Sequence, residues 1–304
     1  MDDFEWTKGN HIAAAILFPL ALFGFTCNLC VVVFLNSMPS LNNSFGSLTL
    51  SQAIVDSIHQ LLLAFFLAPT IYFQNPDMYD ISHQFGYATL LAYEICCFSH
   101  VCISVNRFTA VCVPLAYGKL FSKTNTRIII ASTWILAIGI LTYMLQILDC
   151  DFYLPTGTWI YTFRDNVVCT RVKWYGDFSL NCLSVVIVAV LDVSSIARLH
   201  CINERHNLDA LSAQKRSRQI VLVYQAALQG ILFITELITY FLLSGFARNK
   251  WEAYALTTIS WCLVNGADGF QGGERATPVS SVAHRNDTNT AVRSATTASS
   301  IQRA

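Results

Sequence analysis

The chain has 304 residues and a formal net charge of zero, and 54% of its residues are hydrophobic while only 12% are charged. Soluble domains carry about 25% charged residues, so this composition and a mean hydropathy of +0.47 indicate a polytopic membrane protein. Nucleic-acid binding needs a basic excess, so the balanced charge argues against a nucleic-acid partner. Acidic residues within 1–10 replace the basic stretch of a signal peptide, and we expect no cleavable signal.

Seven apolar stretches predict the architecture. A helix needs about twenty apolar residues to cross the hydrocarbon core, and its backbone must satisfy its own hydrogen bonds there. The sequence therefore predicts an all-α polytopic membrane protein, a seven-transmembrane helix bundle with a short, atypical seventh helix. Pro69 is expected to kink or end the second segment. The expected segments are Ile12–Leu35, Phe45–Phe73, His83–Val111, Ile128–Leu148, Trp174–Leu199, Ile220–Phe246 and Ala253–Phe270.

Basic residues in the loops predict the orientation, since they are enriched on the cytoplasmic side. One set of loops holds Arg107 and the basic run Arg198–Arg218, whereas the opposite loops are richer in acidic residues. We therefore expect an extracellular N-terminus at 1–11, a transmembrane domain at 12–270 and a disordered cytoplasmic tail at 271–304. The tail is rich in Gly, Thr, Ser, Ala and Arg, which cannot build a core.

The cysteines divide into two groups. Nine of the eleven lie in or at the ends of apolar stretches, where they act as small hydrophobes. Only Cys150 and Cys169 lie in a hydrophilic loop, which the topology places outside the cell. A disulfide between them would contribute roughly 3 kcal/mol by loop closure, and two free thiols are the alternative. Since no pair has the flanking ligands of a zinc site, we expect no metal and no cofactor.

A charged group marks the end of the third segment. An arginine costs on the order of 2.5–3.5 kcal/mol at the centre of a membrane helix, so Arg107 must lie near the interface or among polar partners. Pro114 and Tyr117 follow it seven and ten residues on. This spacing resembles the D-R-Y-x-x-V-x-x-P-L-x-Y signature of rhodopsin-like G-protein-coupled receptors, with Asn106 in place of Asp and Phe108 in place of Tyr. The resemblance implies that these five residues belong to an activation switch.

Further positions resemble the same receptors by spacing. Asn28 with Val31 is similar to N-x-x-V of the first helix, and Asp56 lies where the family has a mid-membrane aspartate. Trp134 lies at about the family's distance from the arginine. The resemblance adds Asn28, Asp56 and Trp134 to the switch, while ordinary packing is the alternative for Asn28 and Trp134. A lone carboxylate in lipid needs a function or a partner, and His59 is the candidate partner of Asp56.

Buried charges suggest a ligand site. Glu94 and Glu236 lie inside apolar segments, and the sixth segment carries a polar stripe that should face the bundle. We expect ligand contacts in the outer halves of the third, fifth and sixth helices, with interhelical hydrogen bonding as the alternative. The members of the stripe are Gln225, Gln229, Glu236 and Tyr240. The ligand-binding candidates are Tyr93, Glu94, Asp177, Gln229 and Glu236.

Several departures from hormone and opsin receptors narrow the resemblance. The fifth and sixth segments lack proline, the seventh offers Asn265-Gly266-Ala267-Asp268-Gly269 instead of N-P-x-x-Y, and no cysteine begins the third. Together with Asn-Ser-Phe-Gly at 43–46 and Trp159 between Cys150 and Cys169, this pattern looks like nematode serpentine chemoreceptors of class X over roughly 10–270. The resemblance implies a plasma-membrane receptor of a sensory neuron, with a small-molecule ligand and a heterotrimeric G protein as partners.

The resemblance also implies a mechanism in which Arg107 is a cytosolic latch. Losing the acidic neighbour at position 106 should remove one charge partner and raise basal activity. The alternatives are a membrane transporter or ligand-gated channel, or a non-signalling receptor whose C-terminus is defective, because Gln271–Arg275 interrupts the seventh helix. Transporters tend to show internal repeats and paired helix breaks, which the sequence lacks. Without a Ser/His/Asp set or a nucleotide loop, we do not expect an enzyme.

Overall fold

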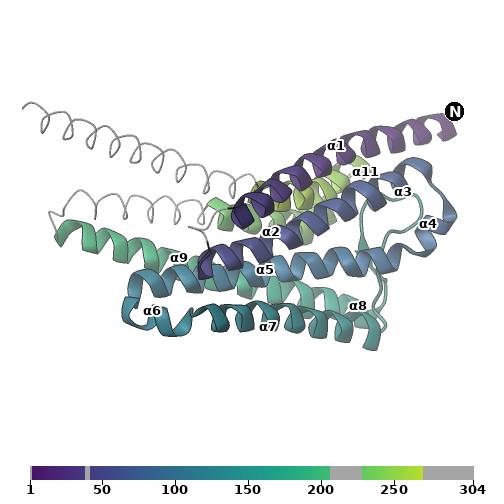
Figure 1. Cartoon of the computed structure of the whole chain (residues 1–304). Helices are drawn as coiled ribbons and strands as arrows, with labels where there is room; N and C mark the ends of the chain where they lie inside the picture. The colour runs from purple at the N-terminus through teal and green to yellow at the C-terminus, as the bar shows by residue number, and fades with distance from the viewer. Residues whose placement is uncertain (1, 38–41, 206–227, 270–304) are drawn as a thin grey trace, which may run out of the picture.

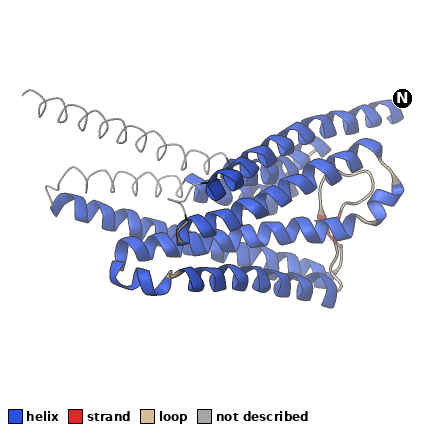
Figure 2. Ribbon diagram, in the orientation of Figure 1, coloured by secondary structure: helices blue, strands red, loops and turns tan. Residues whose placement is uncertain are grey.

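The structure, a computed structural model, describes residues 2–37, 42–205 and 228–269. Helices run side by side along the long axis of the molecule (Figure 1), and a short two-stranded hairpin interrupts the helical pattern (Figure 2). Within these described ranges, six helices are long and apolar enough to cross a membrane, and a seventh helical stretch covers 250–269. The prediction of an all-α bundle is confirmed. The six are Thr7–Ser37, Ser44–Phe73, Ser82–Cys112, Lys123–Ile147, Val167–Leu199 and Leu228–Phe246.

The first two spans form a helical pair. Helix α1 (Asp2–Ser37) packs against α2 (Ser44–Leu62), whose first turn is capped by the Asn43 side chain. The second span continues through the π-helical η2 (Leu63–Leu67) into α3 (Ala68–Phe73). The helix runs through Pro69 to the expected end at Phe73, so this proline does not itself end the span, and the expected kink stays a prediction. The span ends at Gln74, which adopts a positive φ of 53°.

The third span is the central element of the bundle. After the short α4 (Pro76–Asp80), helix α5 (Ser82–Cys112) contacts α2, α7, α9 and β1. It and the second span are the most buried of the six. Side chains on α5 can therefore reach partners on most of the other spans, which suits a helix that carries Tyr93, Glu94 and Arg107.

A short helix, α6, precedes the fourth span. Helix α6 (Pro114–Leu120) begins with proline at its first position, which tolerates the missing N–H. The Ser122 side chain then accepts from Asn125 N at 3.2 Å and caps α7 (Lys123–Leu141). The π-helical η3 (Thr142–Ile147) completes the span.

The loop after the fourth span contains the hairpin. Strands β1 (Phe152–Tyr153) and β2 (Thr162–Phe163) pair antiparallel, with Phe152 opposite Phe163. We call this end of the bundle, where the N-terminus also lies, the hairpin end, and the opposite end the Arg107 end (Figure 1). The fifth span then runs through α8 (Val167–Arg171), the π-helical η4 (Val172–Phe178) and α9 (Ser179–Arg205).

The last two spans are joined by a short turn at the hairpin end. Residues 228–237 are helical and continue into the π-helical η5 (Ile238–Leu243) and the 3-10 turn η6 (Ser244–Phe246). Helix α11 (Lys250–Tyr254), the π-helical η7 (Ala255–Ile259) and helical residues 260–269 form the seventh stretch. The expected start at Ile220, Gln225 of the polar stripe and the expected tail at 271–304 lie outside the described residues.

The distribution of buried and exposed side chains is typical of a membrane protein. Many large apolar side chains on the helix exteriors are exposed, among them Phe23, Ile135 and Val193, where lipid would cover them. The interior holds both an apolar core and polar groups such as Asn28, His59 and Glu94. Polar side chains inside a membrane bundle are costly and mark functional positions or interhelical bonds, so they define where to look for a site.

Candidate functional site

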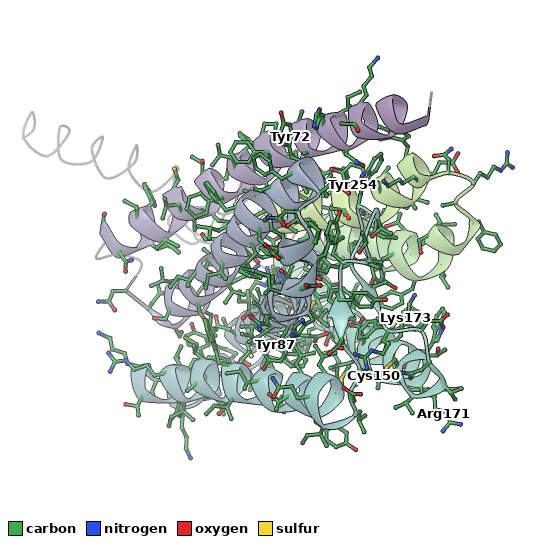
Figure 3. All side chains as sticks on the ribbon, turned by 90° about the vertical axis from the view of Figure 1, so that its right-hand side faces the viewer. Tyr72, Tyr87, Cys150, Arg171, Lys173 and Tyr254 are labelled. Carbon is green, nitrogen blue, oxygen red and sulfur yellow. A yellow bond between two sulfur atoms is a disulfide. The ribbon has the colours of Figure 1, made fainter. Side chains whose placement is uncertain are left out.

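The hairpin loop covers one end of the bundle and is inserted between the helices. Phe152, Leu154, Trp159, Tyr161 and Phe163 are each no more than 6% exposed, although they belong to a loop. Burial raises the pKa of the Tyr161 phenol above its ordinary value, so this group stays neutral at physiological pH. Figure 3 views the molecule from this end, with Cys150 labelled at the base of the loop.

The predicted disulfide between Cys150 and Cys169 is confirmed, and it closes the base of this loop. The pairing ties the start of the loop to helix α8 at the beginning of the fifth span. Arg164 adds exposed ion pairs to Asp149 and Asp151 in the same loop. The disulfide thus holds the two ends of the loop together and attaches the start of the loop to the fifth span.

Replacing Cys150 with serine is expected to lower the free energy of unfolding by about 3 kcal/mol, the loop-closure value for bridged residues separated by 19 positions. Thermal unfolding of purified receptor measures the change. Cys182→Ser, at a half-buried free thiol in α9, is the matched control and should change stability far less. Equal losses in both variants would contradict the assigned role of the bridge.

A single tryptophan anchors the loop to the first and seventh spans. Trp159 donates from Nε1 to Asn10 Oδ1 at 2.7 Å, and its carbonyl accepts from Thr258 Oγ1 at 2.8 Å. Lys250 Nζ lies 3.9 Å from the ring centroid, and Trp251 packs edge-on at 4.5 Å. These partners of Trp159 lie on segments far away in the chain, so its place in a sequence motif did not predict them.

A glycine admits the loop to the third span. A Cβ atom on Gly86 would lie 1.9 Å from the carbonyl oxygen of Phe152, so the backbones of α5 and β1 are in direct contact there. Leu154 N also donates to Ser82 Oγ at 3.2 Å. These contacts fix the loop on α5 without a cysteine at the start of that helix.

Below the loop, four of the five ligand-binding candidates come together. We call Glu94, Asp177 and Glu236 the carboxylate cluster. All three are at most 3% exposed and belong to the third, fifth and sixth spans. Asn181 Nδ2 donates to Glu94 Oε1 at 3.0 Å and to Asp177 Oδ1 at 2.9 Å, and Tyr93 donates to Glu236 Oε2 at 2.7 Å. The side-chain amide of Asn181 is a member that the sequence analysis missed.

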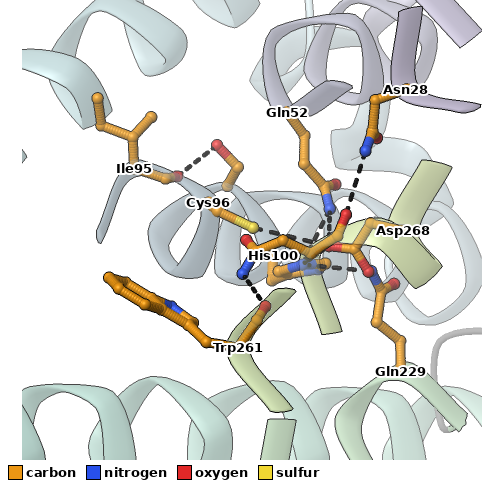
Figure 4. Close-up of polar contacts among 10 residues, drawn as sticks. Asn28, Gln52, Ile95, Cys96, His100, Gln229, Trp261 and Asp268 are labelled. Atoms are coloured by element: carbon orange, nitrogen blue, oxygen red, sulfur yellow. Dashed lines mark hydrogen bonds and ion pairs between the residues drawn. The ribbon is translucent and has the colours of Figure 1, made fainter. Parts of the chain in front are cut away.

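Gln229 belongs to a second cluster, which surrounds Asp268 (Figure 4). Asp268 Oδ2 lies 3.0 Å from both Gln52 Nε2 and His100 Nε2, and Gln229 donates to the other carboxylate oxygen. Cys96 Sγ lies 3.6 Å from Oδ2. These five residues, the mid-bundle cluster, join the second, third, sixth and seventh spans. The structure thus separates Gln229 from the other ligand candidates.

The Cys96, His100 and Asp268 side chains could also hold a metal ion, since their ligand atoms lie within 4.8 Å of one another. The carboxylate of Asp268, however, is already surrounded by amide, imidazole and thiol groups of the protein. The geometry is explained by hydrogen bonds alone, and we assign no metal to it.

Asp56 lies beside the mid-bundle cluster, close to Asp268, Gln52 and Cys96. It is 1% exposed, and Gln52 and Cys96 are its polar side-chain partners. The expected pairing with His59 is wrong, because both ring nitrogens of His59 lack hydrogen-bond partners and its ring packs edge-on against Trp261 at 4.6 Å. One helical turn separates the two side chains along the same helix, and they do not converge.

Two further switch candidates make interhelical hydrogen bonds. Asn28 donates from Nδ2 to the carbonyl of Asn265 at 3.1 Å and so ties the first span to the seventh. A Cβ on Gly269 would lie 2.6 Å from Asn28 N, so these two helices approach closely. Trp134 donates from Nε1 to Ser51 Oγ at 3.0 Å and ties the fourth span to the second.

At the opposite end, Arg107 finds a carboxylate that the sequence analysis missed. Its Nη2 lies 3.3 Å from Asp192 Oδ1 on α9 and 3.0 Å from Ser104 Oγ. The side chains of Arg107 and Asp192 are only 8% and 4% exposed. Asp192 thus supplies a charge partner from another helix. The absence of an acidic residue at position 106 still removes one possible charge partner, and its expected effect on basal activity stays a prediction.

Asn106 is turned away from this ion pair. Its Nδ2 lies 3.3 Å from Ser44 Oγ and 3.5 Å from the Tyr117 hydroxyl, and the two hydroxyls are 2.8 Å apart. This triad connects the second and third spans to α6. Phe108 is half-buried, and the exposed Pro114 begins α6.

A small cavity lies between the mid-bundle cluster and the Arg107–Asp192 pair. It encloses about 20 Å³ and is lined in part by Cys97, His100, Arg107, Val188 and Gln229. This is room for about one water molecule. The third, fifth and sixth spans therefore leave a small gap between their side chains at this level.

Comparisons with known proteins agree with this geometry. The family model of the serpentine type 7TM GPCR chemoreceptor Srx matches residues 18–271. Serpentine receptor class X 45 of Caenorhabditis elegans is 27% identical over 289 residues, which cover 88% of this chain and 80% of that protein. Serpentine receptor class X-43 of the same organism is 23% identical and covers 76% and 72%.

The fold is also that of a solved receptor. The crystal structure of squid rhodopsin matches with a TM-score of 0.70 at 12% identity, over 88% of this chain and 81% of that one. This likeness supports the seven-helix arrangement, and the family model supports the class. The chain belongs to the Srx family of serpentine seven-transmembrane chemoreceptors, and it is a multi-pass membrane protein of the G-protein-coupled receptor class.

Proposed function

We propose that this receptor lies in the plasma membrane with the hairpin end outside, binds a small-molecule cue there and activates a heterotrimeric G protein at the Arg107 end. The N-terminus lies at the hairpin end and is therefore extracellular in this orientation (Figure 1). The bond between Cys150 and Cys169 supports it, since disulfides persist in oxidising compartments. The buried Arg107–Asp192 pair is the single observation that carries the signalling proposal.

The proposed mechanism uses the sixth span as the moving element. Glu236 reaches the carboxylate cluster and Gln229 reaches the mid-bundle cluster, and both are on this span. A ligand that binds one packing of the bundle more tightly shifts the population toward it. In this proposal the small cavity beside Gln229 gives the span room to shift, and Arg107 then leaves Asp192 and becomes available to a G protein.

The proposed orientation is tested by staining an N-terminal tag on intact cells while a glycosylation acceptor is placed after residue 304. Surface staining with an unglycosylated C-terminus is the expected result. An outside C-terminus would mean that the seventh stretch does not insert. That outcome would favour the non-signalling alternative, whereas ligand-driven flux of solute or ions would favour a transporter or channel.

Asn106→Asp is expected to lower basal signalling severalfold. The change places a second carboxylate one residue from Arg107, and a partly buried charge pair of about 1 kcal/mol corresponds to roughly fivefold in the resting equilibrium. A second-messenger assay on cells with matched surface expression measures it. Unchanged basal signalling would show that position 106 acts only through Ser44 and Tyr117.

A further inference from the structure

The hairpin end holds more negative than positive charge in its interior. Glu94, Asp177 and Glu236 approach one another among the third, fifth and sixth spans, and Lys173 is the one cation recorded near them among the described residues. Buried charges are normally paired, because an isolated ion loses its hydration without compensation. With all three carboxyls ionised, the cluster would carry a net charge of minus two.

Two acceptor atoms in the cluster also lack amide or hydroxyl donors. Asn181 Oδ1 makes no hydrogen bond, and Glu94 Oε2 has no amide or hydroxyl donor and only the Asp177 carboxyl near it, although Glu94 and Asn181 are each 1% exposed. Asn181 uses its amide donor group on Glu94 Oε1 and Asp177, so the remaining oxygens are acceptors only. Buried acceptors without partners cost about 1–3 kcal/mol each, and a group with several N–H donors would satisfy them together.

Aromatic rings surround the same space. Tyr93 donates to Glu236 and packs edge-on against Trp261 at 5.4 Å. Lys173 Nζ lies 5.8 Å from the centroid of Tyr240, so one ring of this region already faces an ammonium group. Aromatic faces attract cations by about 0.5–2 kcal/mol. Carboxylates together with aromatic walls are the surroundings that suit an organic ammonium ion.

From these contacts we propose that the carboxylate cluster binds a small aliphatic amine, with diamines preferred over monoamines. The proposal rests on the receptor function proposed above and names the chemical class of its ligand. One ammonium lies between Glu94 Oε2 and Asn181 Oδ1, and a second approaches Glu236. The preference for two charges follows from three carboxylates facing a single lysine.

Binding would also couple to the bundle packing. The cluster is closed in this structure, so an amine with a carbon chain requires the helices to separate. The π-helical segments η4 and η5 carry or adjoin Asp177 and Glu236, and π turns are frequent at functional sites. A ligand that enters only the separated packing has differential affinity for it, which is the requirement for activation.

The first test is binding without signalling. Thermal unfolding of the purified full-length receptor is measured with putrescine, butylamine and butanediol. We expect putrescine to raise the melting temperature, butylamine to need about tenfold higher concentration, and butanediol to have no effect. The Glu94→Gln variant should lose the putrescine shift. Glu252→Gln is the matched control, since Glu252 is exposed at the same end and caps the turn before α11.

The second test separates this inference from the proposed function. Second-messenger production is measured in cells that express the receptor and are exposed to the same three compounds or, separately, to mild acid. The Asp192→Asn variant, tested without ligand, reports whether the receptor activates a G protein at all. A thermal shift with a silent Asp192→Asn variant would retain amine binding and reject the signalling proposal. A signalling Asp192→Asn variant with no thermal shift by either amine would overturn the amine site. Activation by acid alone, lost in Glu94→Gln, would assign the cluster to proton sensing instead.

Discussion

Asp192→Ala is expected to raise basal signalling severalfold and to lower the free energy of unfolding by about 3–5 kcal/mol. The change leaves Arg107 buried without its carboxylate, and an uncompensated buried charge destabilises a fold by that amount. In the proposed resting state, Arg107 and Asp192 stay paired and Arg107 is buried. Losing the pair therefore shifts the population toward the packing that presents Arg107.

The measurement is basal second-messenger production per receptor at the surface, together with thermal unfolding. Asp192→Asn keeps the shape and should raise signalling with a smaller loss of stability. Ser194→Ala on the same helix is the control, because the half-buried Ser194 hydroxyl donates to Val190 O four residues back in its own helix. If Asp192→Ala signals no more than Ser194→Ala, the ion pair does not restrain the receptor.

Gly86→Ala is expected to remove most functional receptor from the cell surface. The added Cβ would lie 1.9 Å from the Phe152 carbonyl oxygen, and a backbone atom cannot move aside as a flexible side chain can. Overpacking typically costs about 1–3 kcal/mol, and here it also displaces the loop that covers the carboxylate cluster. We expect the receptor that does reach the surface to respond poorly to any ligand.

Surface immunostaining and thermal unfolding measure this effect. Gly139→Ala in α7 is the matched control, because no atom lies within 4 Å of a Cβ placed there. Removing a glycine from a helix interior stabilises it by about 1 kcal/mol, so the control should be neutral or better. Normal surface level and ligand response in Gly86→Ala would contradict the seating of the loop on α5.

Much of the fold could be predicted from the sequence because lipid imposes a simple rule. A run of about twenty apolar residues must be helix, so the ends of the described spans were found within two residues, whereas the first, fourth and fifth spans begin five to seven residues earlier than expected. The π turn before Pro69 was not foreseen, since such a turn leaves no periodic signal in the sequence. The hairpin was also missed, because two-residue strands stabilised by burial have no alternating pattern.

The candidate site was predicted less completely. The sequence pointed to Glu94, Asp177 and Glu236, because a carboxylate inside an apolar segment costs free energy wherever it lies. Tyr93 was included as the neighbour of Glu94. Asp192 carries the same signal within the fifth span, yet its pairing with Arg107 depends on which helix faces which. The partners of Trp159 and Gln229 likewise come from distant segments. Spacing along one chain cannot reveal such contacts.

The most direct test of the account is GTP-for-GDP exchange on purified heterotrimeric G proteins by receptor in lipid nanodiscs, without added ligand. We expect Asp192→Asn to exchange faster than the unaltered receptor, and the double variant with Arg107→Ala to fall back to the rate of G protein alone. This result would show that Arg107, once freed from Asp192, carries the signal. Equal exchange by the single and double variants would contradict the account, because the receptor would then act on the G protein without Arg107.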